Sequence, residues 1–273
     1  MIKQAIIPLA GLGTRLLPLT SVIPKELLPI NGKPGFEYIL EECKEAGIKE
    51  VIFVISKKKE IIKKYFNNDA FFKEIIKRKK NDKRLAFEYN KIKKYKKMVK
   101  FVYQNLPRGT GDAILKCQKH IKSNYFLMLL PDDLIMKKNC SLEMIKIHKK
   151  FNASVIASKK VHPNDVSRWG IFKLKKLMKN NFFINDVIEK PSLKRAPSNY
   201  AVIGRYILHK DIFKILKKQK PGQNREIHIT DSIKELIKRK KRFIGHVFAG
   251  KYLDCGSMSG YIKSTLKIAK IKL

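Results

Sequence analysis

The sequence predicts an α/β protein: a mixed, mostly parallel central sheet flanked by helices, with an added antiparallel layer. Three observations support this prediction. The chain has 273 residues, of which 44% are apolar, and this is enough to bury a large core. Short β-branched or aromatic runs alternate with longer amphipathic stretches, as in parallel βα units. After Val161 the runs are closely spaced, which indicates antiparallel strands.

The predicted strands are short apolar runs bounded by turn residues. Those of the parallel part are Gln4–Leu9, Val51–Ser56, Lys100–Gln104, Phe126–Leu130 and Ser154–Lys159. Those of the antiparallel part are Gly170–Leu174, Phe183–Glu189 and Tyr200–Leu208. The run Leu127–Leu130 has no polar alternation, which favours a central strand covered on both faces.

The predicted helices are the longer amphipathic stretches between these strands. They are Phe36–Ala46, Glu60–Lys80, Asp112–Ile121, Leu142–Phe151 and Ser232–Lys240. In the last of them Ser232 and Glu235 have the spacing of a capping box. The Lys-rich stretch Lys77–Lys97 interrupts the pattern, and we expect an exposed excursion there.

The charge of the chain is strongly basic, with 61 Lys and Arg against 23 Asp and Glu and a net charge of +38. Only ten of the basic residues are Arg, whereas nucleic-acid surfaces usually recruit Arg for bidentate contacts. The basic residues are also spread over every predicted helix. This pattern favours a solvated surface, and a Lys-rich nucleic-acid-binding protein is the alternative from another class.

Other classes are disfavoured by what the sequence lacks. The four cysteines are scattered and the six histidines form no cluster, so a zinc site or a disulfide framework is not expected. No apolar run approaches 18 residues, so we expect no membrane span. The run Ala5–Ala10 leads directly into a glycine loop and predicts a buried strand instead of a signal peptide. We expect a reducing cytoplasm.

The loop Ala10–Arg15 follows the first strand and contains two glycines, which let backbone N–H groups approach phosphate oxygens. It is not a Walker loop, because no Gly-Lys-Ser/Thr follows, and Leu16 stands where a dinucleotide fingerprint needs its third glycine. The loop instead ends in a cationic residue, Arg15, and a second cationic residue, Lys25, follows ten residues later. Two cations beside a phosphate cradle suit a polyphosphate that is attacked at its α-phosphorus and loses pyrophosphate.

Asp132 and Asp133 follow the most hydrophobic strand, and open α/β sheets bind ligands at such strand ends. Adjacent carboxylates are costly to desolvate unless a cation compensates them. Because Mg²⁺ takes one or two carboxylates plus phosphate oxygens, Asp132 and the distant Asp254 form a plausible ligand pair. A simple polar turn is the alternative.

Several ordered motifs resemble the sugar-1-phosphate nucleotidylyltransferases, and within them the bacterial enzymes that act on UTP and glucose 1-phosphate. The matching segments are Gly11–Pro18, Pro24–Pro29, Gln104 with Gly109–Ala113, Leu130–Asp133, Val166–Gly170, Glu189–Pro191, Ala201–Tyr206, Glu226 through Asp231, and Asp254–Gly256. The resemblance implies a Rossmann-like nucleotide-diphospho-sugar transferase fold in a single nucleotidyltransferase domain, residues 1–273. Residues 1–160 would mainly bind nucleotide. Residues 161–273, with a C-terminal helix, would mainly bind the sugar phosphate.

The resemblance also implies roles for individual residues. Arg15, Lys25 and Lys190 would be catalytic; Ala10, Gly11, Gly13, Thr14, Glu26, Gln104, Gly109, Gly111 and Asp133 would bind nucleotide; Gly170, Glu189, Lys190 and Gly204 would bind the sugar phosphate; Asp132 and Asp254 would hold Mg²⁺. Simpler interpretations stay open for some of them. Glu189 and Lys190 could be an ion-paired strand end, Gly170 a strand-start glycine and Gly204 a bulge.

The chain departs from the family pattern at several positions. Ser21 and Met258 stand where the family usually has Lys, and Asp112 stands where it has His. Asp112 therefore puts a carboxylate near the nucleotide wall. Trp169 replaces a Tyr and keeps an aromatic ring.

The resemblance predicts the reaction of UTP with α-D-glucose 1-phosphate to UDP-glucose and pyrophosphate, assisted by Mg²⁺. The alternatives are a thymidylyl-, cytidylyl- or guanylyltransferase acting on another sugar phosphate, and a degenerate relative that serves as a regulatory subunit. The family suggests a homodimer or homotetramer. We expect no nucleic-acid or membrane partner.

Overall fold

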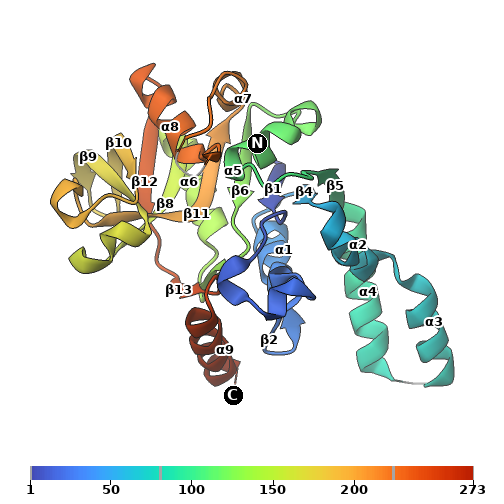
Figure 1. Cartoon of the computed structure of the whole chain (residues 1–273). Coiled ribbons are helices and arrows are strands. Elements are labelled where there is room, and N and C mark those ends of the chain that lie inside the picture. Colours follow the sequence, from blue (N-terminus) through green and yellow to red (C-terminus); the bar gives the residue numbers. More distant parts are fainter. Residues whose placement is uncertain (1, 80–81, 223–224, 273) are drawn as a thin grey trace.

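The computed structural model describes residues 2–79, 82–222 and 225–272. Within them a nine-stranded sheet has the order β5-β4-β1-β6-β11-β8-β12-β10-β9 (Figure 1). Its strands are β1 Gln4–Pro8, β4 Glu50–Ile55, β5 Val99–Tyr103, β6 Tyr125–Leu129, β8 Ser154–Lys160, β9 Gly170–Met178, β10 Asn181–Glu189, β11 Tyr200–His209 and β12 Phe243–Val247. All eight predicted strands are confirmed to within a few residues at their ends, and β12 was not predicted.

Seven of the nine strands run in the same direction, and two, β10 and β11, run against them. Strands β5, β4, β1 and β6 run parallel to one another, and β8 is parallel to β12. Strand β11 lies antiparallel between β6 and β8, and β10 is antiparallel to β12 and β9. The predicted mixed, mostly parallel sheet is therefore confirmed, whereas the expected added antiparallel layer was wrong. The antiparallel strands extend the same sheet, because their backbone groups pair directly with those of the parallel part.

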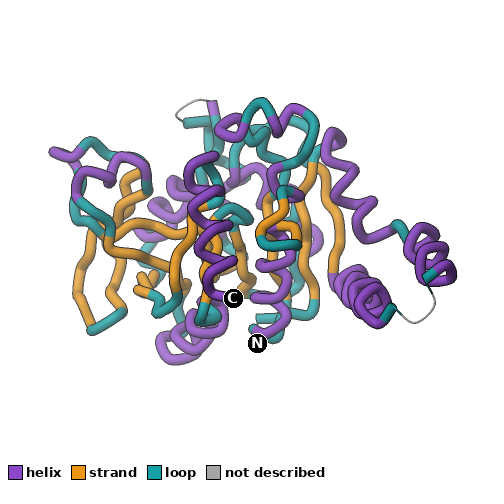
Figure 2. Tube along the Cα trace, turned by 90° about the horizontal axis from the view of Figure 1, so that it is seen from below, coloured by secondary structure: helices purple, strands orange, loops and turns teal. Residues whose placement is uncertain are grey.

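Helices cover both faces of this sheet (Figure 2). They are α1 Gly35–Glu45, α2 Glu60–Asn67, α3 Asp69–Arg78, α4 Lys83–Met98, α5 Thr110–Lys116, α6 Cys140–Phe151, α7 Ile212–Leu216, α8 Ile229–Lys238 and α9 Met258–Lys272. Alternate side chains of β1 enter two hydrophobic clusters. Ala5 and Ile7 pack with residues of α1, α2, α6 and α9, whereas Ile6 packs with residues of α5, α7 and α8. This alternation is the period of two expected for a strand covered on both faces.

The segment from Glu60 onward differs from its prediction. The expected helix Glu60–Lys80 is divided at Asn68 into α2 and α3. The expected excursion Lys77–Lys97 consists largely of α4, which pairs with α3 in a hairpin extending away from the sheet (Figures 1 and 2). The ring of Phe72 stacks on that of Tyr89 at 5.4 Å between centroids and joins the two helices.

Helix α8 begins before the predicted capping box. Its first residue is Ile229, so Ser232 lies inside the helix and its hydroxyl donates to the side chain of Gln219. The capping-box prediction was therefore wrong. The spacing was correct for a helix start, but a tertiary contact uses the hydroxyl.

Two short antiparallel ribbons were not predicted. One pairs β2 (Pro29–Ile30) with β3 (Lys33–Pro34), and the other pairs β7 (Asp133–Met136) with β13 (Lys251–Asp254). In the second ribbon Asp254 lies opposite Asp133. This pairing brings a late segment of the chain to the end of β6. Among the described residues, no helix combines the length and apolar character that crossing a bilayer requires.

Candidate active site

The glycine loop after β1 borders a cleft at the carboxyl ends of the parallel strands. Gly13 has a φ of +71°, and its carbonyl accepts a hydrogen bond from Thr20 Oγ1 at 2.8 Å. None of the described residues has an atom within 4 Å of the point where a Cβ on Gly11 would lie, so a ligand can approach the backbone there. The cleft has a volume of about 530 Å³, and four predicted loop residues line it: Ala10, Gly11, Gly13 and Thr14.

Two cations converge on one carboxylate in this cleft. Lys25 Nζ lies 2.7 Å from Asp132 Oδ2, and Arg15 Nη2 lies 3.5 Å from the same oxygen. Burial raises the pKa of Asp132, but the charges of Lys25 and Arg15 outweigh this effect and hold it below its usual value. The Lys25 side chain is 16% exposed and the Arg15 side chain 67%. Lys25 is therefore fixed, whereas Arg15 is free to follow an entering anion.

Asp254 reaches the same place from the end of β13. Its Oδ1 accepts a hydrogen bond from Gly256 N at 2.8 Å, and its Oδ2 lies 3.6 Å from Arg168 Nη2. A Cβ on Gly256 would lie 2.8 Å from Asp132 Oδ2, 2.9 Å from Arg15 Nη2 and 3.3 Å from Asp254 Oδ1. The structure thus brings together the two carboxylates that were predicted as a ligand pair. A glycine is needed between them because a side chain would fill the space.

These carboxylates fit Mg²⁺ better than a metal held by protein alone. Among the described residues, no three His, Cys, Asp or Glu side chains gather closely enough to form a metal centre. Mg²⁺ is commonly held by one or two carboxylates and completed by substrate phosphates and water. Asp132 and Asp254, whose oxygens both lie near Gly256, provide that donor set.

Glu189, the last residue of β10, and the following Lys190 also line the cleft. Lys190 has a φ of +44°, which is rare for a residue with a side chain, and its N–H donates to Trp169 O at 3.0 Å. A Cβ on Gly170 would lie 3.2 Å from Glu189 Oε2. Gly170 does not line the cleft itself. Because Gly170 has no side chain, there is space for the Glu189 carboxylate beside it.

Three of the residues predicted to bind nucleotide, Gln104, Gly109 and Gly111, lie close together, but only some of them line the cleft. Gln104 and Gly109 line the cleft, and Gln104 Nε2 donates to Asp112 Oδ2 at 2.7 Å and to Gly109 O at 3.1 Å. Gly109 has a φ of +93°, and a Cβ on either Gly109 or Gly111 would lie 2.7 Å from Ile227 O. Gly111 does not line the cleft. A glycine is required at this position because Ile227 and Leu216 pack directly against it.

Glu26 is buried in the wall of the cleft and is fully engaged by a lysine. Lys59 Nζ lies 2.8 Å and 2.7 Å from the two Glu26 carboxylate oxygens and donates to Leu9 O at 2.6 Å. Burial lowers the pKa of Lys59, and the attraction of Glu26 only partly offsets this effect. The pair therefore fixes the start of the glycine loop, and the predicted nucleotide contact of Glu26 is limited to what Lys59 leaves accessible.

Asp133 and Gly204 lie beneath the cleft instead of lining it. The Asp133 carboxylate accepts hydrogen bonds from Gly204 N at 2.9 Å and from Tyr252 Oη at 2.6 Å. Burial, together with the neighbouring charge of Asp132, raises the pKa of Asp133 to about 6. A Cβ on Gly204 would lie 2.4 Å from Asp133 Oδ2. Strand β11 changes register between Val202 and Tyr206, as the predicted bulge requires. We assign both residues a supporting role, which departs from the predicted ligand contacts.

Residues 4–271 match the nucleotidyl transferase family. The chain belongs to this family. A UTP–glucose-1-phosphate uridylyltransferase of Streptococcus pyogenes is 36% identical over 274 residues, which cover 98% of this chain and 90% of the relative.

Solved structures agree with this assignment. A UDP-glucose pyrophosphorylase complexed with UDP-glucose has a TM-score of 0.87 and 37% identity, with 99% of each chain covered. A UTP-bound UGPase from Acinetobacter baumannii has a TM-score of 0.88 and 32% identity, with 98% of this chain and 93% of the other covered. The predicted family and its α/β fold are confirmed.

This nucleotidyl transferase also uses a buried ion pair that the sequence analysis missed. Arg205 is fully buried, and its guanidinium contacts Glu42 through Nε and Nη2 at 2.8 to 3.1 Å. Arg205 Nη1 donates to Leu130 O at 3.1 Å. The pair thus holds the end of β6 just before Asp132. The carboxylate and the guanidinium are 163 residues apart in sequence, so no local pattern indicates them.

Two of the departures from the family pattern lie outside the cleft of this nucleotidyl transferase. Ser21 is exposed and its Oγ donates to Pro18 O at 2.6 Å. Met258 is the first residue of α9. Asp112, in contrast, contacts a residue of the cleft wall directly.

Proposed function

We propose that this protein transfers a uridylyl group from UTP to α-D-glucose 1-phosphate and releases UDP-glucose and pyrophosphate. One observation carries the proposal: the glycine loop, Lys25 with Arg15, and Lys190 face one cleft. The cleft thus offers backbone N–H groups for a polyphosphate and three cationic side chains from two distant parts of the chain. The relatives named UTP–glucose-1-phosphate uridylyltransferase supply the identity of the substrates.

The reaction needs no nucleophile from the protein. A phosphate monoester is largely a dianion at pH 7, so an oxygen of the sugar phosphate attacks the α-phosphorus in line and pyrophosphate leaves on the opposite side. Both reactants are anions and repel each other. Lys25 near the α-phosphate, Arg15 near the leaving phosphates and Lys190 near the attacking phosphate offset this repulsion and align the groups.

Asp132 and Asp254 would hold Mg²⁺. The bound ion would neutralise phosphate charge and orient the phosphates of the triphosphate. Lys25 pairs with Asp132, and its charge keeps that carboxylate ionised.

The two parts of the chain divide the substrates in this proposal. Residues 1–160 would bind nucleotide through the glycine loop and Gln104. Residues 161–273 would bind the sugar phosphate, with Glu189 accepting hydrogen bonds from sugar hydroxyls and Lys190 neutralising the phosphate. We place the reaction in a reducing cytoplasm, which agrees with the four cysteines being buried thiols. A homodimer or homotetramer stays a prediction that sedimentation would test.

A panel of nucleoside triphosphates tests the proposal. The protein is incubated with glucose 1-phosphate and UTP, dTTP, CTP or GTP, with and without Mg²⁺, and pyrophosphate is measured. We expect release with UTP and Mg²⁺ and at least tenfold less when either is replaced or removed. A preference for another triphosphate would support one of the alternative nucleotidylyltransferases. No release with any of them, combined with tight and salt-sensitive binding of duplex DNA, would support a nucleic-acid-binding protein.

A further inference from the structure

We propose that Asp112 is a positioning residue that fixes the orientation of the Gln104 side-chain amide, so that the cleft presents a hydrogen-bond acceptor to the nucleotide base. The inference rests on the proposed function and deepens it, because it names the class of base that the site accepts. That class is a pyrimidine whose ring nitrogen N3 carries a proton, as in the imide of uracil.

Both N–H groups of the Gln104 side-chain amide donate hydrogen bonds within the protein. The backbone N–H of Gln104 separately donates to Ile55 O at 2.9 Å, which fixes the start of the side chain just after β5. Its Nε2 donates to Asp112 Oδ2 at 2.7 Å and to Gly109 O at 3.1 Å. A side-chain amide has only two N–H donors. The two acceptors therefore use the whole donor capacity of Gln104.

The Oε1 atom of the same amide is left for a ligand. Within the described residues it accepts no hydrogen bond, yet it is not sealed from solvent. Gln104 lines the cleft. In this proposal, the free acceptor lies on the cleft side.

Reversal of the amide is opposed by the Asp112 charge. It would place Oε1 against two acceptors, the Gly109 carbonyl and the Asp112 carboxylate, and an ionised carboxylate has no proton to donate. The Gln104 and Asp112 residues are only 4% and 7% exposed, so water cannot readily replace the lost bonds. The bond to a charged acceptor is also the stronger of the two.

A fixed acceptor in this position discriminates between bases. Uracil and thymine carry N–H at N3 and can donate to Oε1, whereas cytosine has an unprotonated N3 that would face it. A buried polar group left unpaired by the wrong ligand causes large discrimination. Asp112 would thus select imide pyrimidines over cytosine without touching the base.

Asp112→Asn tests the inference, because a carboxamide accepts or donates and lets Gln104 adopt both orientations. Binding of UTP and of CTP is measured by calorimetry with Mg²⁺ present, and kcat and KM are measured for both. The loss of one charge-assisted bond predicts that the UTP-to-CTP affinity ratio falls about tenfold. Most of this change should lie in KM, with kcat for UTP within threefold of the parent.

The pair formed by Gln4 and Glu50 provides a matched control. Gln4 Nε2 donates to Glu50 Oε1 at 2.7 Å and to His120 O at 2.8 Å, so its donors have the same kinds of partner outside the cleft, while its Oε1 accepts from Lys122 N and Ser123 N. Glu50→Gln should leave the UTP-to-CTP ratio unchanged. If the Asp112 hydrogen bond served stability alone, both variants would have a lower melting temperature, and both would keep the UTP-to-CTP ratio of the parent.

The outcomes separate this inference from the proposed function. A parent that binds UTP and CTP equally, or an Asp112→Asn variant with the parent's ratio, overturns the inference. A parent that turns over no triphosphate refutes the proposed function, while the binding ratios still decide the inference. If Asp112→Asn does not fold, the Gln104 side-chain amide of the parent is followed by ¹⁵N NMR. Slow exchange of both protons supports the fixed orientation, and fast exchange contradicts it.

Discussion

The ammonium group of Lys25 keeps its charge although it is buried. Burial lowers its pKa, but the carboxylates of Asp132 and Glu26 outweigh this effect, so the pKa of Lys25 is raised. A positive charge that is present before the substrates arrive needs no reorganisation during the reaction. This preorganisation is the main source of electrostatic catalysis.

Lys25→Ala is expected to lower kcat about 100-fold, or about 3 kcal/mol in activation free energy, because a charge-assisted contact to the reacting phosphate is lost. Steady-state kinetics at saturating UTP and glucose 1-phosphate give the value. Lys33→Ala is the control, since Lys33 pairs with Glu41 outside the cleft. A kcat for Lys25→Ala within threefold of the parent would remove Lys25 from the mechanism.

The raised pKa of Asp133 predicts that the stability of the metal-free protein depends on pH. Its pKa is about 6 in the folded state and about 3.9 in an unfolded chain, so between these values the folded state holds a proton that the unfolded state has released. The contribution is complete below pH 4 and is lost as the pH rises through 6. The free energy of unfolding of the parent, relative to Asp133→Asn, should therefore fall by up to about 3 kcal/mol from pH 4 to 7. Urea unfolding at both pH values measures it, and a constant difference would contradict the assignment.

At the level of secondary-structure elements, the hairpin of α3 and α4 adds surface more than core. Helix α3 has no buried residue in its described span, and α4 buries only Ile92 and Tyr95. The hairpin is held to the rest of the protein near its base, where Lys91 pairs with the buried Glu37 at 2.8 Å.

Two substitutions in α4 test this description. Ile92 is 5% exposed and Phe87 is 66% exposed. Ile92→Ala should lower the free energy of unfolding by about 2–4 kcal/mol because it leaves a cavity, whereas Phe87→Ala should change it by less than about 0.5 kcal/mol. Equal effects in urea unfolding would show that the hairpin packs differently.

The elements that could be predicted from the sequence are those in which the position in the sheet determines the spacing of the apolar residues. Strand β6 is an example, because burial on both faces leaves an uninterrupted apolar run that is visible without a structure. The ribbon of β7 and β13 was missed, since each strand has four residues and the pairing joins segments more than 110 residues apart. The division of Glu60–Lys80 at Asn68 was also missed, because both halves keep a helical period.

The candidate site was predictable where a motif fixes the chemistry and unpredictable where the fold adds a partner. Lys25, Asp132 and Asp254 belong to recognisable motifs and converge as expected. Lys59 lies in a run of three lysines that resembles any solvated turn, yet it ends beside the glycine loop. Its one local signal was its place directly after a predicted strand, at the edge where ligands bind.

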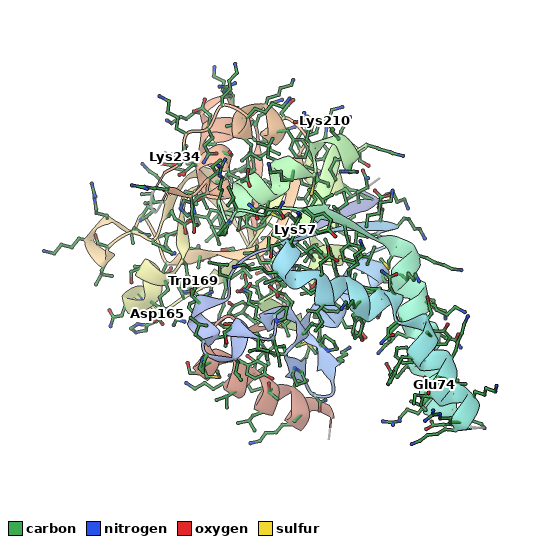
Figure 3. All side chains as sticks on the ribbon, turned by 45° about the vertical axis from the view of Figure 1, so that its right-hand side comes forward. Lys57, Glu74, Asp165, Trp169, Lys210 and Lys234 are labelled. Atoms are coloured by element: carbon green, nitrogen blue, oxygen red, sulfur yellow. The ribbon has the colours of Figure 1, made fainter. Side chains whose placement is uncertain are left out.

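Taken as a whole, the molecule carries its excess charge on many faces. Figure 3 shows nitrogen-tipped side chains in many directions around the molecule, and the labelled Lys57, Lys210 and Lys234 lie in separate segments of the chain. This distribution agrees with a solvated basic surface and not with a single stripe that tracks a nucleic acid. A net charge of +38 also means that the folded state repels itself.

Salt should therefore stabilise the protein. The screening length falls from about 10 Å at 0.1 M to about 3 Å at 1 M salt, so we expect the melting temperature to rise by several degrees between these NaCl concentrations. Differential scanning calorimetry measures the shift, with an uncharged osmolyte as the control for general solute effects. A flat or falling melting temperature would show that local ion pairs compensate the net charge.

The place of Asp254 has a consequence for protein synthesis. The last strand of the sheet in chain order, β12, ends at Val247, whereas the carboxylate that would complete the metal pair follows on the short ribbon. A nascent chain that has left the ribosome as far as β12 already contains every strand of the nine-stranded sheet. It still lacks Asp254, so the growing polypeptide would acquire its catalytic competence only after every strand of the sheet has been synthesised.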